Sequence, residues 1–345
     1  MGAHVRFVVP QGIDDLARPS GGNAYDRRLR DGLRARGWDV HDLVATVRLC
    51  HDLGRLPDGA LVLVDGLVAS TAGPILLPEA DRLRIVVLVH MPLGGVEVPE
   101  DDEGRVLACA TAVVTTSAWT RQRLLDRYGL PPERVAVARP GADLLEEAPG
   151  TPGGDRLLCV GAVVEHKGQD LLVDALARIP DLPWTCTFVG SLDREPSFVD
   201  RLRRRAADAC LADRIRVAGP LAGDVLTGMY RASDLLVLPS RLETYGMVVT
   251  EALAAGLPVV GTTVGGVPEA LGRTASGLPG RLVPPDDPAA LAEVLGAWLR
   301  DAGLRAQLRT AARERRRTLD DWDRTVESVA DVLSGVLAPA VGAGA

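Results

Sequence analysis

The stretch LLVLPSRLETYGMVVTEALAAGLPVVGT, residues 235–262, decides the fold of the second half of the chain. LLVLPS is an apolar run of strand length, LETYG predicts a sharp turn, and MVVTEALAA predicts a helix that ends at Gly256, just before Pro258. PVVGT then begins another apolar run. A strand, a helix and a second strand in this order predict a parallel pair buried beneath helices, because parallel strands need a crossover connection.

The same alternation of apolar runs and amphipathic segments continues outward in both directions. The runs are VRFVVP (5–10), ALVLVDG (60–66), IVVLVH (85–90), AVVTTS (112–117), RVAVARPG (134–141), LLCVGAVV (157–164), TCTFVGS (185–191) and RIRVAGP (214–220). We therefore predict an α/β protein with two Rossmann-like, doubly wound parallel-sheet domains that face each other across a cleft. Ligands are expected at the carboxyl ends of the strands.

A segment rich in Pro, Gly and acidic residues, PGADLLEEAPGTPGGD at 140–155, is typical of an interdomain linker. We place an N-terminal domain over residues 1–148 and a C-terminal domain over 149–320. The helical pattern at about 321–335 predicts a last helix that packs back on the first domain.

Composition restricts the class of protein. The length of 345 residues favours two domains, and the net charge of -7 argues against a protein that holds nucleic acid. Five cysteines without a C-x-x-C pair suit reduced thiols, so we expect a cytoplasmic protein with no zinc site. No apolar run approaches the length of a spanning helix or a signal peptide. Both a monomer and a homodimer are compatible with the sequence.

Gly246 opens the helix in the first stretch, and the unpaired N–H groups there make a site for a phosphate. Glu243 in the turn and Glu251 two helical turns later are placed to bind sugar hydroxyls beside that anion. The alternative is an ordinary turn followed by a solvated glutamate.

Lys167 is the only lysine of the chain, although Lys and Arg together number 39. It lies in VGAVVEHKGQDLLVDAL, 160–176, in a turn that follows a strand and precedes a helix whose N-cap we expect at Asp170. A compact ammonium at this place suits the charge on a departing phosphate. A solvated surface lysine is the alternative.

The first domain offers PSGGNAYDRRLRDGLRARGWDV, 19–40, with a glycine-rich turn before a helix. Gly21 and Gly22 would let the backbone approach a ligand, and Asn23 either caps the helix or contacts an acceptor. The spacing is not that of a dinucleotide fingerprint. His90 ends the run IVVLVH, where a strand delivers its imidazole to the edge of the sheet; a structural histidine is the alternative.

At this point the chain resembles the retaining glycosyltransferases of family 4, which have the GT-B fold. The resemblance covers nearly the whole chain. It rests on the family's pattern S-x-x-E-x-[FY]-G…E-A-[LM]-A-x-G-x-P-V-V, which is matched by Ser240, Glu243, Tyr245, Gly246, Glu251, Ala252, Gly256 and residues 258–260.

The resemblance implies a role for each matching position. Glu243, Lys167 and His90 would be the catalytic residues. The donor-binding residues would be Gly21, Gly22, Lys167, Gly190, Ser191, Leu221, Glu243, Tyr245, Gly246, Met247, Val248 and Glu251, and the acceptor-binding residues would be Asn23, Tyr25 and His90. It implies a hexosyltransferase that takes its sugar from a nucleotide diphosphate sugar, with UDP or GDP favoured, and needs neither metal nor cofactor.

Ala162 departs from the family, which usually has an arginine there that contacts the leaving diphosphate. Either another arginine substitutes, with Arg241 and Arg139 as candidates, or leaving-group stabilisation is weaker by about 3 to 4 kcal/mol. Two alternatives therefore stand beside the transferase: an epimerase or hydrolase of the same fold, and a catalytically weakened nucleotide-sugar-binding protein.

The acceptor expected for the transferase is a small metabolite, a natural product or a glycan. The first helix carries a basic face made of Arg27, Arg28, Arg30, Arg34 and Arg36. A charge run of this kind is usually solvated, so peripheral membrane contact is the less favoured interpretation.

Overall fold

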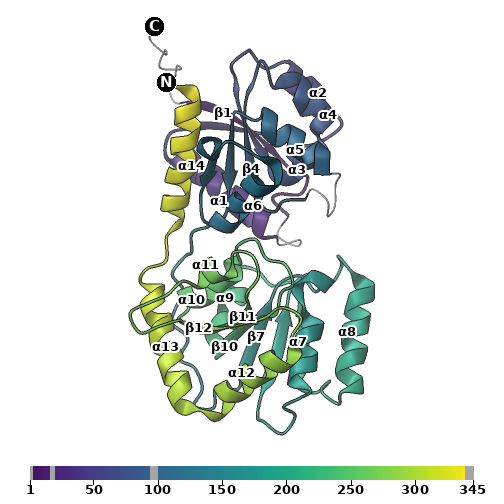
Figure 1. Cartoon of the computed structure of the whole chain (residues 1–345), viewed down its shortest axis with the longest axis vertical. Coiled ribbons are helices and arrows are strands. Elements are labelled where there is room, and N and C mark those ends of the chain that lie inside the picture. The colour runs from purple at the N-terminus through teal and green to yellow at the C-terminus, as the bar shows by residue number, and fades with distance from the viewer. Residues whose placement is uncertain (1–2, 16–19, 94–99, 339–345) are drawn as a thin grey trace. The chain divides into compact units, whose positions relative to one another are not determined.

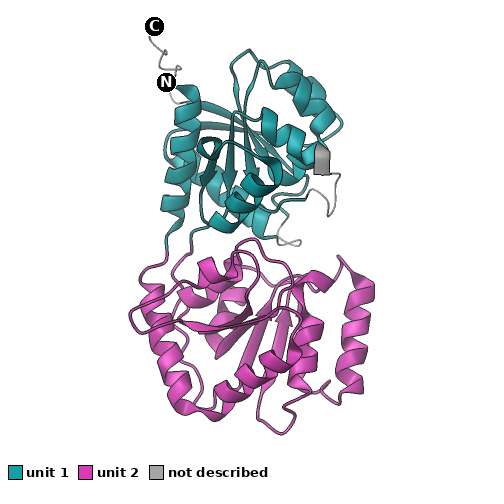
Figure 2. Ribbon diagram, in the orientation of Figure 1, with its two compact units in different colours: residues 1–15, 20–141, 320–345 teal, residues 16–19, 142–319 magenta. Residues whose placement is uncertain are grey.

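The computed structural model describes residues 3–15, 20–93 and 100–338. These residues form two compact units (Figure 2): one comprises the described residues up to 141 and from 320 onward, and the other comprises 142–319. Each unit has one six-stranded, fully parallel sheet flanked by helices, which confirms the predicted α/β fold with two doubly wound sheets.

The sheet of the first unit has the order β2-β1-β3-β4-β5-β6 (Figure 1). Its strands are β1 (His4–Val9), β2 (Asp39–Val44), β3 (Leu61–Asp65), β4 (Arg84–Val89), β5 (Ala112–Thr115) and β6 (Val135–Val137). Its helices are α1 (Gly21–Ala35), α2 (Leu49–Gly54), α3 (Gly66–Thr71), α4 (Gly73–Leu76), α5 (Glu100–Cys109), α6 (Ala118–Tyr128) and α14 (Trp322–Leu337). The terminal helix α14 packs on α1, where a side chain at Gly32 would collide with Val326.

The sheet of the second unit has the order β12-β11-β10-β7-β8-β9. Its strands are β7 (Arg156–Val160), β8 (Thr185–Val189), β9 (Ile215–Gly219), β10 (Leu235–Leu238), β11 (Val259–Thr262) and β12 (Gly280–Val283). Its α-helices are α7 (Gln169–Leu176), α8 (Pro196–Asp208), α9 (Gly223–Ala232), α10 (Met247–Ala254), α11 (Val267–Leu271), α12 (Pro288–Arg300) and α13 (Ala302–Arg316).

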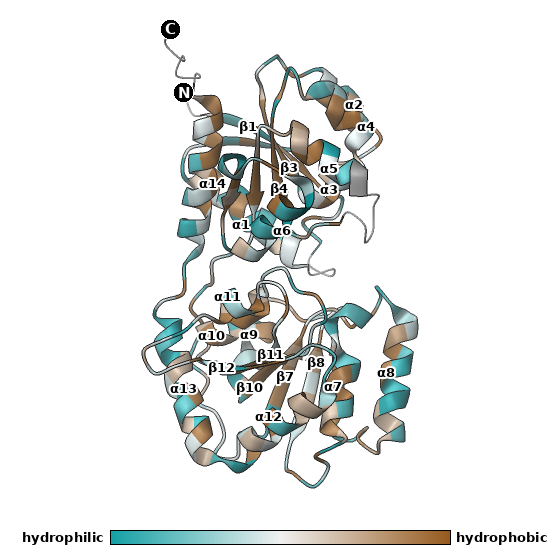
Figure 3. Ribbon diagram, viewed as in Figure 1, coloured by the Kyte–Doolittle hydropathy of each residue, from teal (hydrophilic) through white to brown (hydrophobic). Residues whose placement is uncertain are grey.

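Alternate residues of the inner strands enter opposite cores, which is why those strand segments are almost wholly apolar (Figure 3), whereas the edge strands β2 and β9 carry polar and exposed residues. In β7, Leu157 and Cys159 pack into one core of the second unit, and Leu158 and Val160 pack into the other. The first unit has the same arrangement. Burial on both faces holds each sheet rigid and fixes the positions of the loops at its carboxyl edge.

None of the described helices is long and apolar enough to cross a membrane. All five cysteines are free thiols, as expected from their spacing.

Candidate active site

The second unit brings two loops together at the switch point of its sheet. β7 and β10 are neighbours, and the chain leaves β7 for β8 and β9 on one side before it returns to β10 on the other. Loops that follow two such strands diverge and leave room for a ligand at the carboxyl edge. The loop after β7 carries Lys167, and the loop after β10 carries Glu243.

Lys167 and Glu243 form an ion pair at this edge. The Lys167 Nζ atom lies 2.5 Å from Glu243 Oε2, although the two residues are 76 positions apart in the chain. The Lys167 side chain is 23% exposed and the Glu243 side chain 12% exposed, so the pair is enclosed on most sides but reachable from solvent. Two residues that the sequence singled out separately are thus one structural feature.

The start of α10 has no side-chain cap. Gly246 is the N-cap residue and adopts a left-handed conformation with φ of 92°, which disfavours other residues. Because glycine offers no capping side chain, the amides of the first turn, which begins with Met247 and Val248, stay available to a ligand.

The turn that carries Glu243 rests on a glycine pair that the sequence analysis did not identify. A Cβ atom at Gly265 would lie 1.6 Å from the Glu243 carbonyl oxygen, and one at Gly266 would lie 2.3 Å from that of Thr244. The Gly266 amide also donates to the Glu243 carbonyl at 3.1 Å. Two adjacent glycines just after the β11 strand are the signal for this close backbone approach.

Glu251 lies two turns into α10 and is largely enclosed. The Tyr230 hydroxyl donates to its Oε2 atom at 2.6 Å. Burial raises the pKa of Glu251, and the bond from Tyr230 opposes that rise. These contacts exclude the alternative that Glu251 is a solvated helix residue. Tyr230 lies in α9, and no sequence pattern pointed to it.

The other predicted donor residues of this unit fall into two groups. Gly190 and Ser191 follow β8 and Leu221 follows β9, so all three lie at the same edge as Lys167. A Cβ atom at Gly190 would collide with the Gly161 carbonyl, because the loops after β7 and β8 touch through their backbones. Tyr245 is only 6% exposed and belongs to the core beneath the turn.

The structure removes Arg241 from the candidates that could replace the arginine missing at Ala162. The Arg241 guanidinium is held by Asp170 at 2.8 Å and by Asp286 at 2.7 Å, so carboxylates already balance its charge. The predicted N-cap at Asp170 is also wrong. Gly168 caps α7, and Asp170 lies in the first turn with its carboxylate turned to Arg241.

The first unit begins α1 earlier than the sequence suggested. Gly21 and Gly22 are its first two residues, so they belong to the helix and not to a preceding turn. The Ser20 side chain caps the helix by accepting from the Asn23 amide at 3.1 Å, which excludes the alternative that Asn23 is the cap. Pro19, at the start of the predicted turn, lies outside the described residues.

Tyr25 is a core residue. It is 0% exposed, and its hydroxyl donates to the Ala138 carbonyl at 2.9 Å. Its ring meets the rings of His90 and Trp322 edge to face. This burial corrects the prediction that Tyr25 contacts an acceptor, since the helical periodicity of the sequence did not show which face of α1 is covered.

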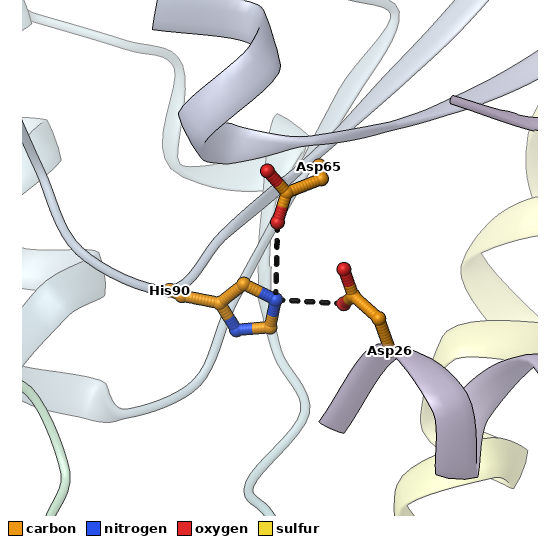
Figure 4. Close-up of side chains that lie close together, drawn as sticks. All are labelled: Asp26, Asp65 and His90. Atoms are coloured by element: carbon orange, nitrogen blue, oxygen red, sulfur yellow. Dashed lines mark hydrogen bonds and ion pairs between the residues drawn. The ribbon is translucent and has the colours of Figure 1, made fainter. Parts of the chain in front are cut away.

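His90 follows β4 and lies beside two buried acids (Figure 4). Its Nε2 atom is 2.7 Å from Asp26 Oδ1 and 3.5 Å from Asp65 Oδ2. Ligand atoms of the three residues all lie within 4.8 Å of one another. The shortest of these contacts is a hydrogen bond between Nε2 and the Asp26 carboxylate, so we describe a proton-bridged cluster and assign no metal to it.

Neither acid was identified from the sequence. Asp65 stands at the end of the apolar run ALVLVDG, as His90 stands at the end of IVVLVH, so the same signal marks both. Asp26 has no such signal, because α1 carries acids and arginines on several sides and its sequence does not show which acid is buried.

Two arginines of the basic face of α1 pair with acids of the same unit. Arg30 is 9% exposed and pairs with Asp14 and Asp42, both at 2.9 Å. Arg34 also reaches Asp42, at 3.3 Å. Arg30 thus departs from the solvated face expected of the arginine run, whereas Arg28, Arg34 and Arg36 are exposed as expected.

Comparisons with known proteins relate the second unit to a described family. The family model for glycosyl transferases group 1 matches residues 146–315. The chain is 36% identical over 262 residues to a protein of Salinispora tropica named D-inositol 3-phosphate glycosyltransferase, with 68% of this chain and 53% of that protein aligned. It is 32% identical over 327 residues to a protein of the same name from Geodermatophilus obscurus, with 85% and 62% aligned. The chain thus spans less than two thirds of these relatives.

Solved structures share the fold over almost the whole chain. The sucrose-phosphate synthase of Thermosynechococcus elongatus has a TM-score of 0.80 at 21% identity, with 97% of this chain and 99% of that chain covered. HepE of Anabaena, solved in complex with UDP and glucose, has a TM-score of 0.77 at 19% identity, with 96% and 99% covered. Residues 146–315 therefore match the model of group 1 glycosyl transferases, and the whole chain has the GT-B fold.

Proposed function

We propose that the protein is a retaining hexosyltransferase that moves a sugar from a nucleotide diphosphate sugar to an acceptor hydroxyl. The nucleotide of the donor would be UDP or GDP. The observation that supports this most strongly is the Lys167–Glu243 pair, which lies at a sheet switch point in the same loop system as the uncapped start of α10. A cation and open helix amides suit a diphosphate, and a carboxylate beside them suits sugar hydroxyls.

In this proposal the second unit binds the donor. The amides after Gly246 and the Lys167 ammonium hold the diphosphate and stabilise the charge that develops on it as the sugar leaves. Glu243 gives up part of its ion pair to accept hydrogen bonds from the sugar. Glu251, kept in place by Tyr230, accepts hydrogen bonds from the ribose, and Gly190, Ser191 and Leu221 line the base.

The first unit receives the acceptor in this proposal, with His90 and Asn23 as contacts and Gly21 and Gly22 near the reacting groups. The curated relatives are named for D-inositol 3-phosphate, which makes that compound the first acceptor to test. Other small metabolites, natural products and glycans follow it.

The transfer as proposed needs no metal, because Lys167 and the helix amides supply the positive charge that a cation would otherwise bring. We also propose that the protein works in the cytoplasm, as a monomer or a homodimer.

A second candidate function is a catalytically weakened protein that binds a nucleotide sugar. The Ala162 side chain has no charge with which to bind a phosphate, and Arg241 already forms ion pairs with Asp170 and Asp286. Unless Arg139 supplies the second cation, leaving-group stabilisation would be lower while donor binding remains.

The test is calorimetric titration with UDP, GDP, ADP and TDP, beside the variants Glu251→Gln and Arg205→Gln. Arg205 lies on α8, forms a surface ion pair with Asp174 of α7, and serves as the control. The proposal expects one nucleotide to bind and only Glu251→Gln to weaken it. Turnover of the matching UDP- or GDP-sugar with D-inositol 3-phosphate distinguishes a transferase from a protein that only binds the donor, and NMR of the product's anomeric carbon tests retention. Free or isomerised sugar in a reaction without acceptor would indicate a hydrolase or an epimerase.

A further inference from the structure

The cluster of His90, Asp26 and Asp65 in the first unit is built from three separate elements. Asp26 comes from the second turn of α1, Asp65 ends β3, and His90 follows β4 (Figure 4). Asp26 is 0% exposed and Asp65 3% exposed. The His90 side chain is 18% exposed, so the ring forms the outer member of the cluster.

One oxygen of this cluster has no hydrogen-bond partner among the described residues. Asp26 Oδ1 accepts from His90, but Asp26 Oδ2 is buried and unsatisfied. Asp65 Oδ1 accepts from the amides of Leu67 and Val68 at the start of α3. A buried carboxylate oxygen without a donor is costly, so a proton on a neighbouring group would stabilise it.

Asp65 can supply that proton at a pH below its pKa, and it is ionised above that pH. Burial and then the charge of Asp26 raise the pKa of Asp65 to about 7, against the opposing charge of His90. A protonated Asp65 can donate a hydrogen bond to the Asp26 carboxylate. The two carboxyls then carry one negative charge between them.

The contact with Asp26 decides which nitrogen of His90 carries a proton. Nε2 faces a carboxylate at 2.7 Å and must therefore be the N–H, which leaves Nδ1 on the side of the ring turned away from both acids (Figure 4). Burial lowers the pKa of His90, but the charge and hydrogen bond of Asp26 and the charge of Asp65 outweigh it, so the net pKa is raised.

The ring is also held in place by its neighbours on α1. Tyr25 meets it edge to face with ring centroids 5.1 Å apart, and the Tyr25 hydroxyl is engaged elsewhere. A Cβ atom at Gly22 would lie 3.2 Å from His90 Cδ2, so the absence of a side chain there gives the ring its room. The titratable groups that face His90 in the described residues are thus Asp26 and Tyr25 from α1 and Asp65 from β3.

We propose that Asp26 and Asp65 are positioning residues that hold His90 as an imidazolium, with Nε2–H fixed on Asp26 and Nδ1–H offered to an oxygen of the bound substrate. The proposal deepens the proposed function and rests on it only for the identity of that substrate. The protonation and orientation of His90 are properties of the protein without any ligand.

The decisive experiment is NMR of the full chain labelled with ¹⁵N-histidine and titrated with acid and base in the absence of nucleotide. The chain has five histidines, and His90→Gln assigns the signal. We expect Nε2 to stay protonated throughout and His90 to titrate above the ordinary histidine range. Asp26→Asn and Asp65→Asn should each bring the titration of His90 down, and Asp39→Asn, whose exposed side chain pairs with His4 and His41, should leave it unchanged.

A wild-type His90 with Nδ1 as its N–H in the neutral ring, or one that titrates at or below the ordinary range, overturns the proposal. The same holds if Asp26→Asn leaves the titration where it was. Asp65→Asn keeps the oxygen that caps α3, so this variant and the wild type decide the question even if Asp26→Asn does not fold.

Activity provides a second readout that a structural role would not move. In the wild type, kcat/KM should fall as pH rises through the pKa of His90, and this limb should shift to lower pH in Asp65→Asn. Asp26→Asn should lose about tenfold to a hundredfold in kcat/KM, because the ring is no longer held. If His90 titrates as expected but no sugar donor is turned over, the proposed function fails and the assignment of the cluster stands.

Discussion

The two units differ in how they begin the helices that follow the strands at their switch points. In the first unit, the Ser20 side chain caps α1 and the Asp65 side chain caps α3. In the second unit, the N-cap residues of α7 and α10 are Gly168 and Gly246, and glycine has no side chain that could accept from the helix amides. One edge satisfies its helix amides internally, and the other leaves them open.

The charges follow the same division. The open amides of the second unit lie in a loop system that contains Lys167, so that edge suits an anion. The capped edge of the first unit holds two acids and a histidine that share protons, so it suits hydrogen bonding to a polar substrate. The N-cap residues of these four helices thus give the carboxyl edges of two similar sheets different binding properties.

The largest expected effect breaks the anion site of the second unit. Lys167→Met should lower kcat by about 10²- to 10³-fold, because the leaving diphosphate loses its cation. It should also weaken binding of the nucleotide diphosphate in calorimetry. Arg205→Met removes an exposed cation of the same unit and should change neither value. Unaltered affinity in Lys167→Met would show that the ammonium does not contact the phosphates.

A second change tests whether the close backbone approach builds that site. Gly265→Ala places a Cβ atom 1.6 Å from the Glu243 carbonyl at a residue with φ of 52°. We expect a loss of about 3 kcal/mol in the free energy of unfolding of the second unit, together with weaker nucleotide binding. Gly228 lies in α9, where an added Cβ atom would meet open space, so Gly228→Ala is the control. Calorimetric unfolding scans measure the stability of each variant, and calorimetric titration with the nucleotide measures binding.

The third prediction concerns the acids of the first unit. Because the folded-state pKa of Asp65 is raised from 3.8 to about 7, the stability tied to its proton is complete below its unfolded pKa and is lost as pH rises through about 7. An asparagine side chain does not ionise, so Asp65→Asn should gain about 2 kcal/mol over the wild type between pH 5 and pH 8. Melting temperatures at the two pH values measure this. A difference that stays constant with pH would mean that Asp65 is ionised throughout.

The smallest expected effect sharpens the role of Glu251. Tyr230→Phe removes the hydrogen bond to its carboxylate and should cost about 1 kcal/mol of stability. The bond lowers the pKa of Glu251, so its loss should raise that pKa further. A double-mutant cycle with Glu251→Gln measures the coupling by chemical denaturation. Additive effects would show that the bond contributes nothing to the fold.

The sequence predicted the fold of both units because strand and helix patterns are local. Runs such as LLVLPS and IVVLVH are apolar at consecutive positions, and they became strands buried on both faces. The same local information marked Glu243, Lys167 and His90, since each stands directly after such a run or in the turn that follows it.

What the sequence determined by itself is therefore the order of strands and helices and the residues that stand at strand ends. Only the tertiary structure decided which of those residues meet. It paired Lys167 with Glu243, committed Arg241 to two acids, buried Tyr25 and joined His90 to Asp26 and Asp65. The physical reason is that these partners come from strands and helices far apart in the chain, and their contact depends on strand order and helix packing, which no local periodicity encodes.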